Sequence, residues 1–248
     1  MYHFFKNIIK QIVPRKLIFE QEETFRSFYS IFYSGDTFEC NVCEKKLRTF
    51  IELPNADSLC PNCGSLKRNR RLWQLLENEF LTPNSNVLDF SPSRCLYRKL
   101  KKIKTINYQS TDLSGDFIAD NQFDITNLEI TDNSLDLIIC YHILEHIEND
   151  IKAMKELFRV MKPGAKALIQ TPFKEGEIYE DYTIKSGQDR LKHFGQEDHV
   201  RIYSALGLKK RLENCGFLVE IRENIIDENK YCFDKEEKII VITKSLNS

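Results

Sequence analysis

The sequence of 248 residues has no long apolar run, no strong net charge and no internal repeat. No stretch approaches the roughly 18 consecutive apolar residues of a membrane span, so we expect no transmembrane segment. Thirty-six basic and thirty-seven acidic residues leave no global field that would attract nucleic acid or anionic lipid. The N-terminus lacks the long apolar core and small-residue cleavage site of a secretory signal, so we expect a cytoplasmic protein.

The first 36 residues predict a helical segment. Within residues 1–13 apolar side chains recur at three- and four-residue spacing with lysines between them, which predicts an amphipathic helix ending at Pro14. This helix could pack on the protein or a partner, or lie in a membrane interface. Residues 20–33 are aromatic-rich and predict a second helix.

Two Cys-x-x-Cys pairs follow, in a region that we assign to residues 37–66. Cys40 with Cys43 and Cys60 with Cys63 are separated by sixteen residues, a spacing that suits two knuckles around one tetrahedral zinc ion. Gly64 can supply the positive φ of such a knuckle. Four thiolates close the coordination shell, so the predicted site is structural. Two disulfides or four unliganded thiols are the alternatives.

A basic stretch begins in the linking helix expected within residues 67–84 and continues to Lys104. Zinc ribbons often bind nucleic acid, so this stretch could face RNA. The neutral overall charge and the lack of a basic strand interleaved with aromatic residues favour a solvated helix face instead.

From residue 85 onward, short apolar runs alternate with helical patterns. Such alternation predicts an α/β domain over residues 85–248 with a doubly wound, mostly parallel Rossmann-like sheet. The expected strands are 86–90, 106–111, 135–141, 165–171, 217–223 and 238–243, and the expected helices are 94–102, 149–161 and 204–215. Sheets of this kind bind ligands at the carboxyl ends of their strands.

One long block carries a family resemblance. Residues 124–164 read DITNLEITDNSLDLIICYHILEHIENDIKAMKELFRVMKPG, which resembles the motif block of class I S-adenosylmethionine-dependent methyltransferases of the small-molecule type. The resemblance spans roughly 160 residues. The segments CPNCGSLKRNRRLWQLL and DRLKHFGQEDHVRIYSALGLKKRLENCGF also resemble a bacterial subgroup of these enzymes with an N-terminal four-cysteine zinc ribbon.

The resemblance implies S-adenosylmethionine as cofactor, together with structural zinc. It implies that Asp112 accepts hydrogen bonds from the ribose hydroxyls and that Asp124 accepts one from the adenine amine. Ser91 stands where the family usually has a glycine that lets the backbone approach the cofactor. The expected cofactor-binding residues are Asp89, Phe90, Ser91, Asp112, Leu113, Asp124, Ile125 and Tyr141.

Methyl transfer from a sulfonium depends mainly on alignment, and a general base helps when the acceptor carries a proton. His142, just beyond a predicted strand, is the candidate base, whereas Glu145 and His146 are expected to brace the following turn. The polar loop that follows the predicted strand at 165–171 suggests an acceptor pocket. Alternatively, its polar side chains make hydrogen bonds within the protein and bind no acceptor. Its candidate substrate-binding residues are His193, Gln196, His199 and Arg201. Without a third ligand, His193 and His199 predict no metal site.

Three functional hypotheses remain open. The leading one is a methyltransferase acting on the oxygen or nitrogen of a small-molecule or glycan-type acceptor. The second is a zinc-ribbon RNA methyltransferase, and the third is a non-catalytic binding protein with a methyltransferase fold, motivated by the missing glycines. Thr171-Pro172-Phe173 differs from the Asn/Asp-Pro-Pro-aromatic motif of amino-group methylases that act on bases, and no Pro-Cys nucleophile is present.

Overall fold

The computed structural model describes residues 15–223 and 229–246. The helix expected over residues 1–13 lies outside these ranges. The chain forms two compact units, Met1–Leu76 with Ser93–Lys99 and Ile226–Asp234, and Glu77–Pro92 with Leu100–Ile225 and Lys235–Ser248. The two units therefore interleave along the chain. Within the described ranges, no helix is both long and apolar enough to cross a membrane.

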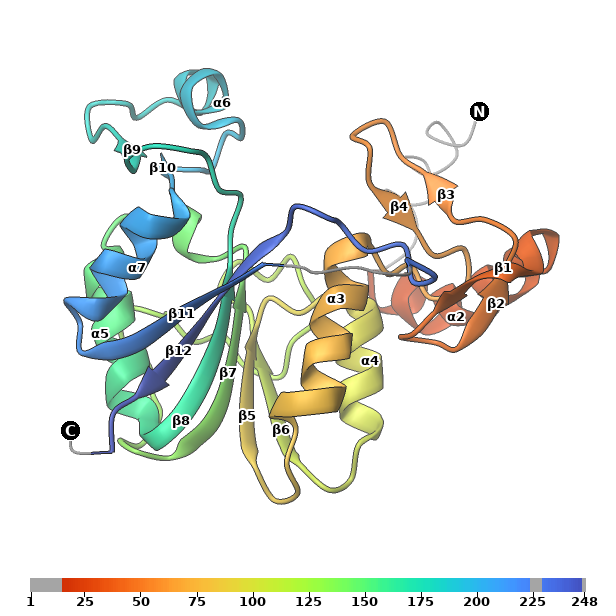
Figure 1. The fold of residues 1–248 in the computed structure, drawn as a ribbon, viewed down its shortest axis with the longest axis horizontal. Helices are drawn as coiled ribbons and strands as arrows, with labels where there is room; N and C mark the ends of the chain where they lie inside the picture. The colour runs from red at the N-terminus through yellow and green to blue at the C-terminus, as the bar shows by residue number, and fades with distance from the viewer. Residues whose placement is uncertain (1–14, 224–228, 247–248) are drawn as a thin grey trace. The chain divides into compact units, whose positions relative to one another are not determined.

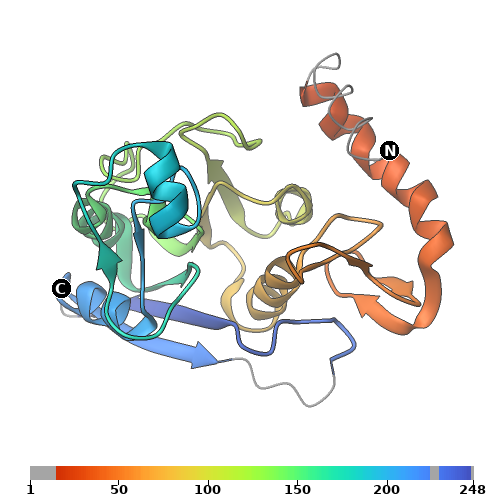
Figure 2. The ribbon, with the colours of Figure 1, turned by 90° about the horizontal axis from the view of Figure 1, so that it is seen from above.

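The first unit contains a long N-terminal helix, short hairpins and the helix that follows them (Figure 2), together with most of a later helix within residues 93–99. Its elements are α2 (Arg15–Ser30), η1 (Ile31–Tyr33), β1 (Ser34–Cys40), β2 (Lys45–Leu47), β3 (Ile51–Glu52), β4 (Ser58–Leu59) and α3 (Lys67–Leu75). Strand β1 pairs antiparallel with β2, and β3 pairs antiparallel with β4. The first cysteine pair spans the last residue of β1 and the turn to β2, and the second pair follows β4 directly.

Arg70 of α3 connects two segments of this unit, residues 58–65 and 231–232. Its side chain is fully buried, and it donates hydrogen bonds to the carbonyls of Ser58, Ser65, Tyr231 and Cys232 at 2.7 to 3.2 Å. A guanidinium can make this many contacts because it has five donors in a rigid plane. The expectation that the basic stretch forms a solvated helix face is therefore wrong for Arg70.

The second unit is built on a six-stranded sheet with the order β11-β12-β8-β7-β5-β6 (Figure 1). The strands are β5 (Asn86–Phe90), β6 (Asn107–Thr111), β7 (Leu135–Tyr141), β8 (Met161–Gln170), β11 (Phe217–Glu223) and β12 (Lys238–Lys244). Strands β6, β5, β7 and β8 pair in parallel, whereas β12 is antiparallel to both of its neighbours. The predicted doubly wound, mostly parallel sheet is confirmed.

Helices and short elements connect these strands. They are η2 (Leu76–Phe80), α4 (Arg94–Lys102), η3 (Leu144–His146), α5 (Asp150–Val160), β9 (Tyr179–Glu180), α6 (Gly187–Phe194), β10 (Arg201–Ile202) and α7 (Ala205–Glu213). Helix α5 begins where the side chain of Asn149 accepts a hydrogen bond from the Lys152 amide, a standard N-cap. Its buried residues Ala153, Leu157 and Val160 recur at helical spacing and belong to the core of the sheet unit.

Strand β8 begins earlier than the sequence indicates. Helix α5 ends at Val160 and β8 starts at Met161, whereas the sequence predicted a helix to 161 and a strand from 165. Helix α5 ends shortly before Pro163, whose ring disfavours helical backbone at Lys162. Gly164 has φ +80°, and the pairing of β7 with β8 shifts register here, so the Pro-Gly pair forms an irregularity inside the strand.

Candidate functional site

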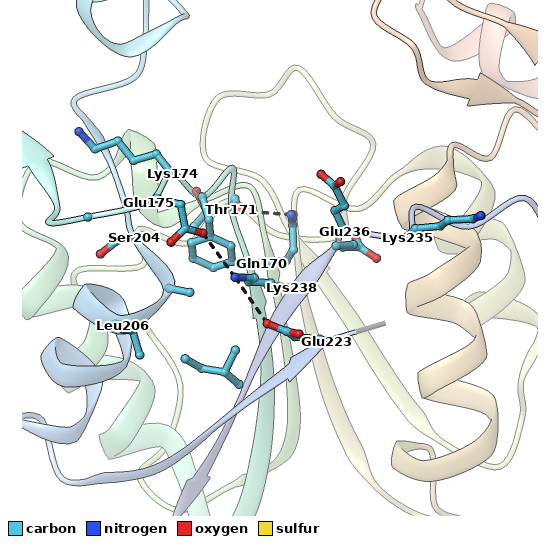
Figure 3. Close-up of a pocket in the computed structure, with 15 residues that line it drawn as sticks. Gln170, Thr171, Lys174, Glu175, Ser204, Leu206, Glu223, Lys235, Glu236 and Lys238 are labelled. Carbon is cyan, nitrogen blue, oxygen red and sulfur yellow. Dashed lines mark hydrogen bonds and ion pairs between the residues drawn. The ribbon is translucent and has the colours of Figure 1, made fainter. Parts of the chain in front are cut away.

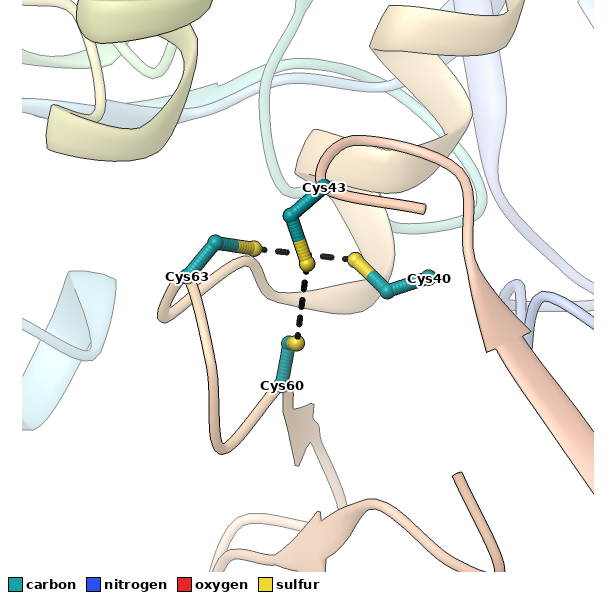
Figure 4. A group of neighbouring side chains, drawn as sticks. All are labelled: Cys40, Cys43, Cys60 and Cys63. Atoms are coloured by element: carbon teal, nitrogen blue, oxygen red, sulfur yellow. Dashed lines mark hydrogen bonds between the residues drawn. The ribbon is translucent and has the colours of Figure 1, made fainter. Parts of the chain in front are cut away.

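The four paired cysteines converge in the first unit (Figure 4). The sulfur atoms of Cys40 and Cys63 lie 3.6 Å apart, and those of Cys43 and Cys60 lie 3.8 Å apart. Sulfurs that bind one tetrahedral zinc ion at about 2.3 Å are about 3.8 Å from each other, so the cluster has the size that zinc requires. None of the eight cysteines forms a disulfide in this structure, which contradicts the disulfide alternative.

The two knuckles have the same backbone turn. The amide of Glu44 donates to the Cys40 carbonyl at 2.6 Å, and the amide of Gly64 donates to the Cys60 carbonyl at 3.0 Å. Glu44 has φ +60° and Gly64 has φ +76°. The sequence predicted this conformation for Gly64 and missed it for Glu44, because nothing but its position after Cys43 signals it.

The carboxyl ends of β5 and β6 meet through Ser91 and Asp112. Ser91 has φ +46°, a conformation that favours glycine, and its amide donates to the Thr111 carbonyl at 2.8 Å. Its hydroxyl donates to Oδ1 of buried Asp112 at 2.7 Å, and Oδ2 of Asp112 accepts from the Ser114 hydroxyl at 2.9 Å. The serine in the expected glycine position thus adopts a glycine-like backbone conformation.

The other expected cofactor residues differ in exposure. Asp89 is buried and accepts a hydrogen bond from the Tyr108 hydroxyl at 3.0 Å. Burial raises the pKa of Asp89 to about 8, although the bond from Tyr108 acts in the opposite direction. Leu113 is 60% exposed at the end of β6.

Phe90 and Ile125 are part of the buried core of the second unit, which gives both a packing role. Asp124 is exposed, and its Oδ1 accepts a hydrogen bond from the Thr126 amide at 2.8 Å. Tyr141 is half-buried at the end of β7. Among the eight expected residues, Ser91 and Asp112 are joined by a side-chain hydrogen bond.

His142 follows β7 in a strained conformation. Its φ is +56°, and its amide donates to the Gln170 carbonyl at 2.8 Å. Its Nδ1 lies 3.3 Å from Oε1 of Glu145, an ion-pair distance without the alignment of a hydrogen bond. Its Nε2 is buried and has no hydrogen-bond partner among the described residues. Non-glycine residues held at positive φ often mark functional sites.

Glu145, His146 and His199 form a second cluster of metal-binding groups. One ligand atom from each lies within 4.8 Å of the others. The rings of His146 and His199 pack edge to face with centroids 4.7 Å apart. Burial and the neighbouring His146 lower the pKa of His199. From the sequence, His199 was considered as a metal ligand only together with His193. Glu145 and His146, which the sequence did not reveal as its partners, lie more than fifty positions earlier in the chain.

Arg201 lies inside the fold beside this cluster. It is fully buried, pairs with Oε2 of Glu180 at 2.9 Å, and donates to the carbonyls of Leu144 at 3.2 Å and Glu148 at 2.9 Å. It also donates to the Ile147 carbonyl. These acceptors give Arg201 the role of a clamp on the turn around η3, which is not the substrate-binding role that the sequence indicated.

The remaining loop candidates do not join His199 and Arg201. His193 is exposed, with its Nδ1 2.7 Å from the Tyr179 hydroxyl. Gln196 is also exposed. The expected four-residue acceptor pocket is therefore not formed as a single group.

A cleft of about 800 Å³ opens at the carboxyl end of β8 (Figure 3). Its lining includes Gln170, Thr171, Phe173, Lys174, Ser204, Leu206, Ile221, Glu223 and Lys238. Lys238 lies 3.5 Å from carboxylate oxygens of both Glu175 and Glu223. None of the four predicted acceptor residues lines this cleft. The sequence did not reveal the cleft because its walls come from four separated segments.

Much of the basic stretch is paired within its own unit. Arg98 lies 3.2 Å from Glu22, and Lys99 lies 2.9 Å from Glu44. In the second unit, Lys101 lies 2.8 Å from Asp120. Because these pairs neutralise a large part of the positive charge, they weigh against an extended phosphate-binding surface.

The strand order, the parallel centre and the polar carboxyl edge define a Rossmann-like methyltransferase fold. A family model described as a methyltransferase domain matches residues 65–220. This match covers more than half of the chain, and the chain belongs to the methyltransferase domain family.

Curated and solved proteins agree with this assignment. A protein of Mycolicibacterium smegmatis named as a probable S-adenosylmethionine-dependent methyltransferase is 31% identical over 97 residues, which are 39% of this chain and 34% of that protein. The chain spans about a third of the length of the curated relatives that it matches.

Two solved structures have the same fold. The complex of the Haloferax volcanii Trm112 methyltransferase activator with a methyltransferase gives a TM-score of 0.51 at 15% identity, over 70% of this chain and 88% of that chain. Haemonchus contortus phosphoethanolamine N-methyltransferase 2 with S-adenosyl-L-methionine gives 0.51 at 14% identity, over 71% and 52%.

Proposed function

We propose that this protein transfers the methyl group of S-adenosylmethionine to an oxygen or nitrogen of a small-molecule or glycan-type acceptor. The observation that carries the proposal is the edge formed by the carboxyl ends of β5, β6 and β7, where Ser91, Asp112 and His142 all lie. Doubly wound sheets bind their ligands at this edge.

The residues at the ends of β5 and β6 fit the cofactor. Ser91 has a positive φ, a conformation that favours glycine, so this turn can still bring the backbone close to the cofactor. Asp112 offers carboxylate oxygens for the ribose hydroxyls, and exposed Leu113 offers an apolar surface beside them. The bound cofactor would supply an activated methyl group with a good leaving group.

His142 is proposed as the general base. Glu145 lies at its Nδ1, an arrangement that can hold the imidazole with the proton on that nitrogen. The lone pair of Nε2 is then available to accept the proton that the acceptor oxygen or nitrogen loses as its bond to the methyl carbon forms. The cleft beside β8 is the proposed acceptor site, since its carboxylates, amines and apolar walls suit a polar organic molecule.

The cysteine cluster is proposed to hold structural zinc. Four thiolates leave no open coordination position, so the ion would fold the ribbon and take no part in the reaction. This assignment rests on the sulfur spacing and on the two matching knuckle turns.

Isothermal titration with S-adenosylmethionine, followed by transfer of labelled methyl to a cell extract, tests the proposal. We expect cofactor binding in the wild type and in His142→Asn, and a loss of transfer of about 100-fold or more in His142→Asn. Glu213→Gln is the control, because Glu213 is an exposed residue of the same unit and lies outside the predicted cofactor-binding and acceptor residues. Absence of binding by folded, zinc-loaded protein would refute cofactor use, and binding without any transfer would favour a non-catalytic role.

A further inference from the structure

We propose that Glu145, His146 and His199 form a binding site for a divalent transition-metal ion. The three residues come from η3 and from the segment just before β10. One potential ligand atom from each lies within 4.8 Å of the other two, and all three belong to the second unit. This site would be additional to the zinc expected at the four cysteines.

Two of the three side chains are buried without the partners that buried polar groups require. Glu145 is 1% exposed, and neither of its carboxylate oxygens accepts a hydrogen bond from a described residue. His199 is 4% exposed, and its Nε2 likewise has no hydrogen-bond partner in the described ranges. Nδ1 of His142 lies 3.3 Å from Oε1 of Glu145 without hydrogen-bond alignment, and Oε2 has no hydrogen-bond partner in the described ranges. Buried polar atoms are normally satisfied, and a buried carboxylate without hydrogen bonds is costly. A cation between these atoms would satisfy both side chains.

Both histidines have the outer partners that metal-binding histidines usually have. Nδ1 of His146 lies 3.1 Å from Oδ2 of Asp198, and Nδ1 of His199 lies 3.2 Å from the Phe194 carbonyl. When Nδ1 donates its proton to a carboxylate or carbonyl, Nε2 carries the lone pair that binds the metal. In that tautomer, Nε2 of each imidazole would be free to bind the ion.

The fold keeps the two halves of the cluster together. The Val200 amide donates to the Glu145 carbonyl at 2.9 Å, which fixes the residue after His199 against η3. The next residue, buried Arg201, donates hydrogen bonds to the carbonyls of Leu144 and Glu148 in the same turn. Such rigid support is what a preformed metal site needs.

Two imidazoles and one carboxylate define the class of ion. This donor set suits Zn²⁺, Fe²⁺, Co²⁺ or Mn²⁺ better than Ca²⁺ or Mg²⁺, which prefer oxygen alone. Three protein ligands leave a position for water or for an oxygen of the acceptor. That last step rests on the proposed function, whereas the metal site itself does not.

Cobalt binding to the full-length protein tests the site. The protein is first loaded with one equivalent of zinc, which the four thiolates should retain, and then titrated with Co²⁺. We expect one further ion per chain after gel filtration, with an absorption spectrum that lacks sulfur-to-cobalt charge transfer. No cofactor or acceptor is added, so the result is independent of the proposed methyl transfer.

Four substitutions locate the ion. His146→Asn, His199→Asn and Glu145→Gln should each weaken cobalt binding by more than about 100-fold, and Asp198→Asn by roughly 10- to 100-fold. The side chain of Asp198 is 69% exposed, so this variant should fold normally even if the buried variants do not. His193→Asn is the control and should bind cobalt like the wild type.

Three results would overturn the proposal. The first is no cobalt retained by the folded, zinc-loaded wild type. The second is a charge-transfer spectrum showing that cobalt has entered the cysteine cluster. The third is folded Asp198→Asn and His146→Asn proteins that bind cobalt as tightly as the wild type.

Discussion

The cysteine cluster and the cluster around Glu145 are assembled in different ways. All four cysteines lie within residues 40–63, and two short turns with the same hydrogen bond present them. His146 and His199 are more than fifty residues apart in the sequence. Only tertiary contacts bring their ring centroids to within 4.7 Å of each other. The cysteine cluster is therefore formed by local turns. The cluster around Glu145 is formed by long-range contacts, among them the hydrogen bonds of buried Arg201.

This difference predicts what each site depends on. The ribbon has little core of its own, so an ion should provide much of its stability. The turn around η3 belongs to a sheet unit with a large core, so its geometry should depend on Arg201 and persist without any metal. Substitutions can separate these two kinds of dependence.

The largest effect is expected in the cysteine cluster. Cys60→Ser should abolish zinc retention and unfold the ribbon, because zinc binding by four thiolates contributes on the order of 10 kcal/mol to folding of such modules. Cys215→Ser, a half-buried thiol outside the cluster, should keep both. Zinc analysis and limited proteolysis of residues 34–66 measure this. A stoichiometric zinc content with a protected ribbon in Cys60→Ser would contradict the local-turn account.

The next effect is expected at the clamp. Arg201→Met should destabilise the sheet unit by about 3 to 5 kcal/mol, because it removes a buried ion pair with Glu180 and the side-chain donor to the carbonyls of Ile147 and Glu148. Arg190→Met removes a pair with exposed Glu148 and should cost less than about 1 kcal/mol. Urea unfolding distinguishes the two variants. Equal stability losses would show that Arg201 is not a clamp.

The sequence predicts most of the elements but few of the contacts between them. The strands at 86–90, 135–141 and 217–223 and the helix at 94–102 have the predicted limits, because alternating and helical apolar patterns are local properties. The cysteine spacing is local too. The early start of β8 was missed because the sequence pattern extended the helix to residue 161 and placed the strand after Pro163-Gly164.

The candidate site was harder to predict for a physical reason. Arg201 was assigned to a substrate loop because a polar residue in an irregular segment gives no sign of what it contacts. Its acceptors lie more than fifty positions earlier in the chain, at Leu144 and Glu148. His199 was missed as a partner of His146 for the same reason, since no periodic pattern connects them.

The pH dependence of stability should reveal buried Asp89 at the edge of the sheet. The folded state holds the proton of Asp89 up to a pKa of about 8, whereas the unfolded chain releases it near 3.8. Folding therefore takes up a proton between these values, so the contribution is complete below pH 3.8 and is lost as the pH rises through 8.

Asp89→Asn should remove on the order of 1 to 3 kcal/mol of the stability difference between pH 5 and pH 8. Denaturant midpoints at both pH values measure it. Asp120 provides a control of opposite sign, because Lys101 and Ser110 outweigh its burial and lower its pKa. An unchanged pH slope in Asp89→Asn would mean that this carboxyl is ionised in the folded protein.

The smallest effect is expected at Ser91, where the family's glycine is missing. Ser91→Gly relieves a positive φ worth roughly 1 kcal/mol and loses a hydrogen bond to Asp112 of similar value, so stability should change by less than about 1 kcal/mol. Ser91→Ala keeps the strain and loses the bond, so it should be the less stable of the two.

Cofactor affinity then decides what the serine does. Its hydroxyl occupies Oδ1 of Asp112, one of the two oxygens proposed to accept from the ribose. If that bond competes with the ribose, Ser91→Gly should bind S-adenosylmethionine more tightly than the wild type in isothermal titration, and Ser91→Ala should lie between them. If both variants bind more weakly, the bond instead orients Asp112 for the cofactor. In that case the hydrogen bond between Ser91 and Asp112 would do what the backbone flexibility of glycine does in other members of the family. A contact between two strand ends would then replace a local property of one residue.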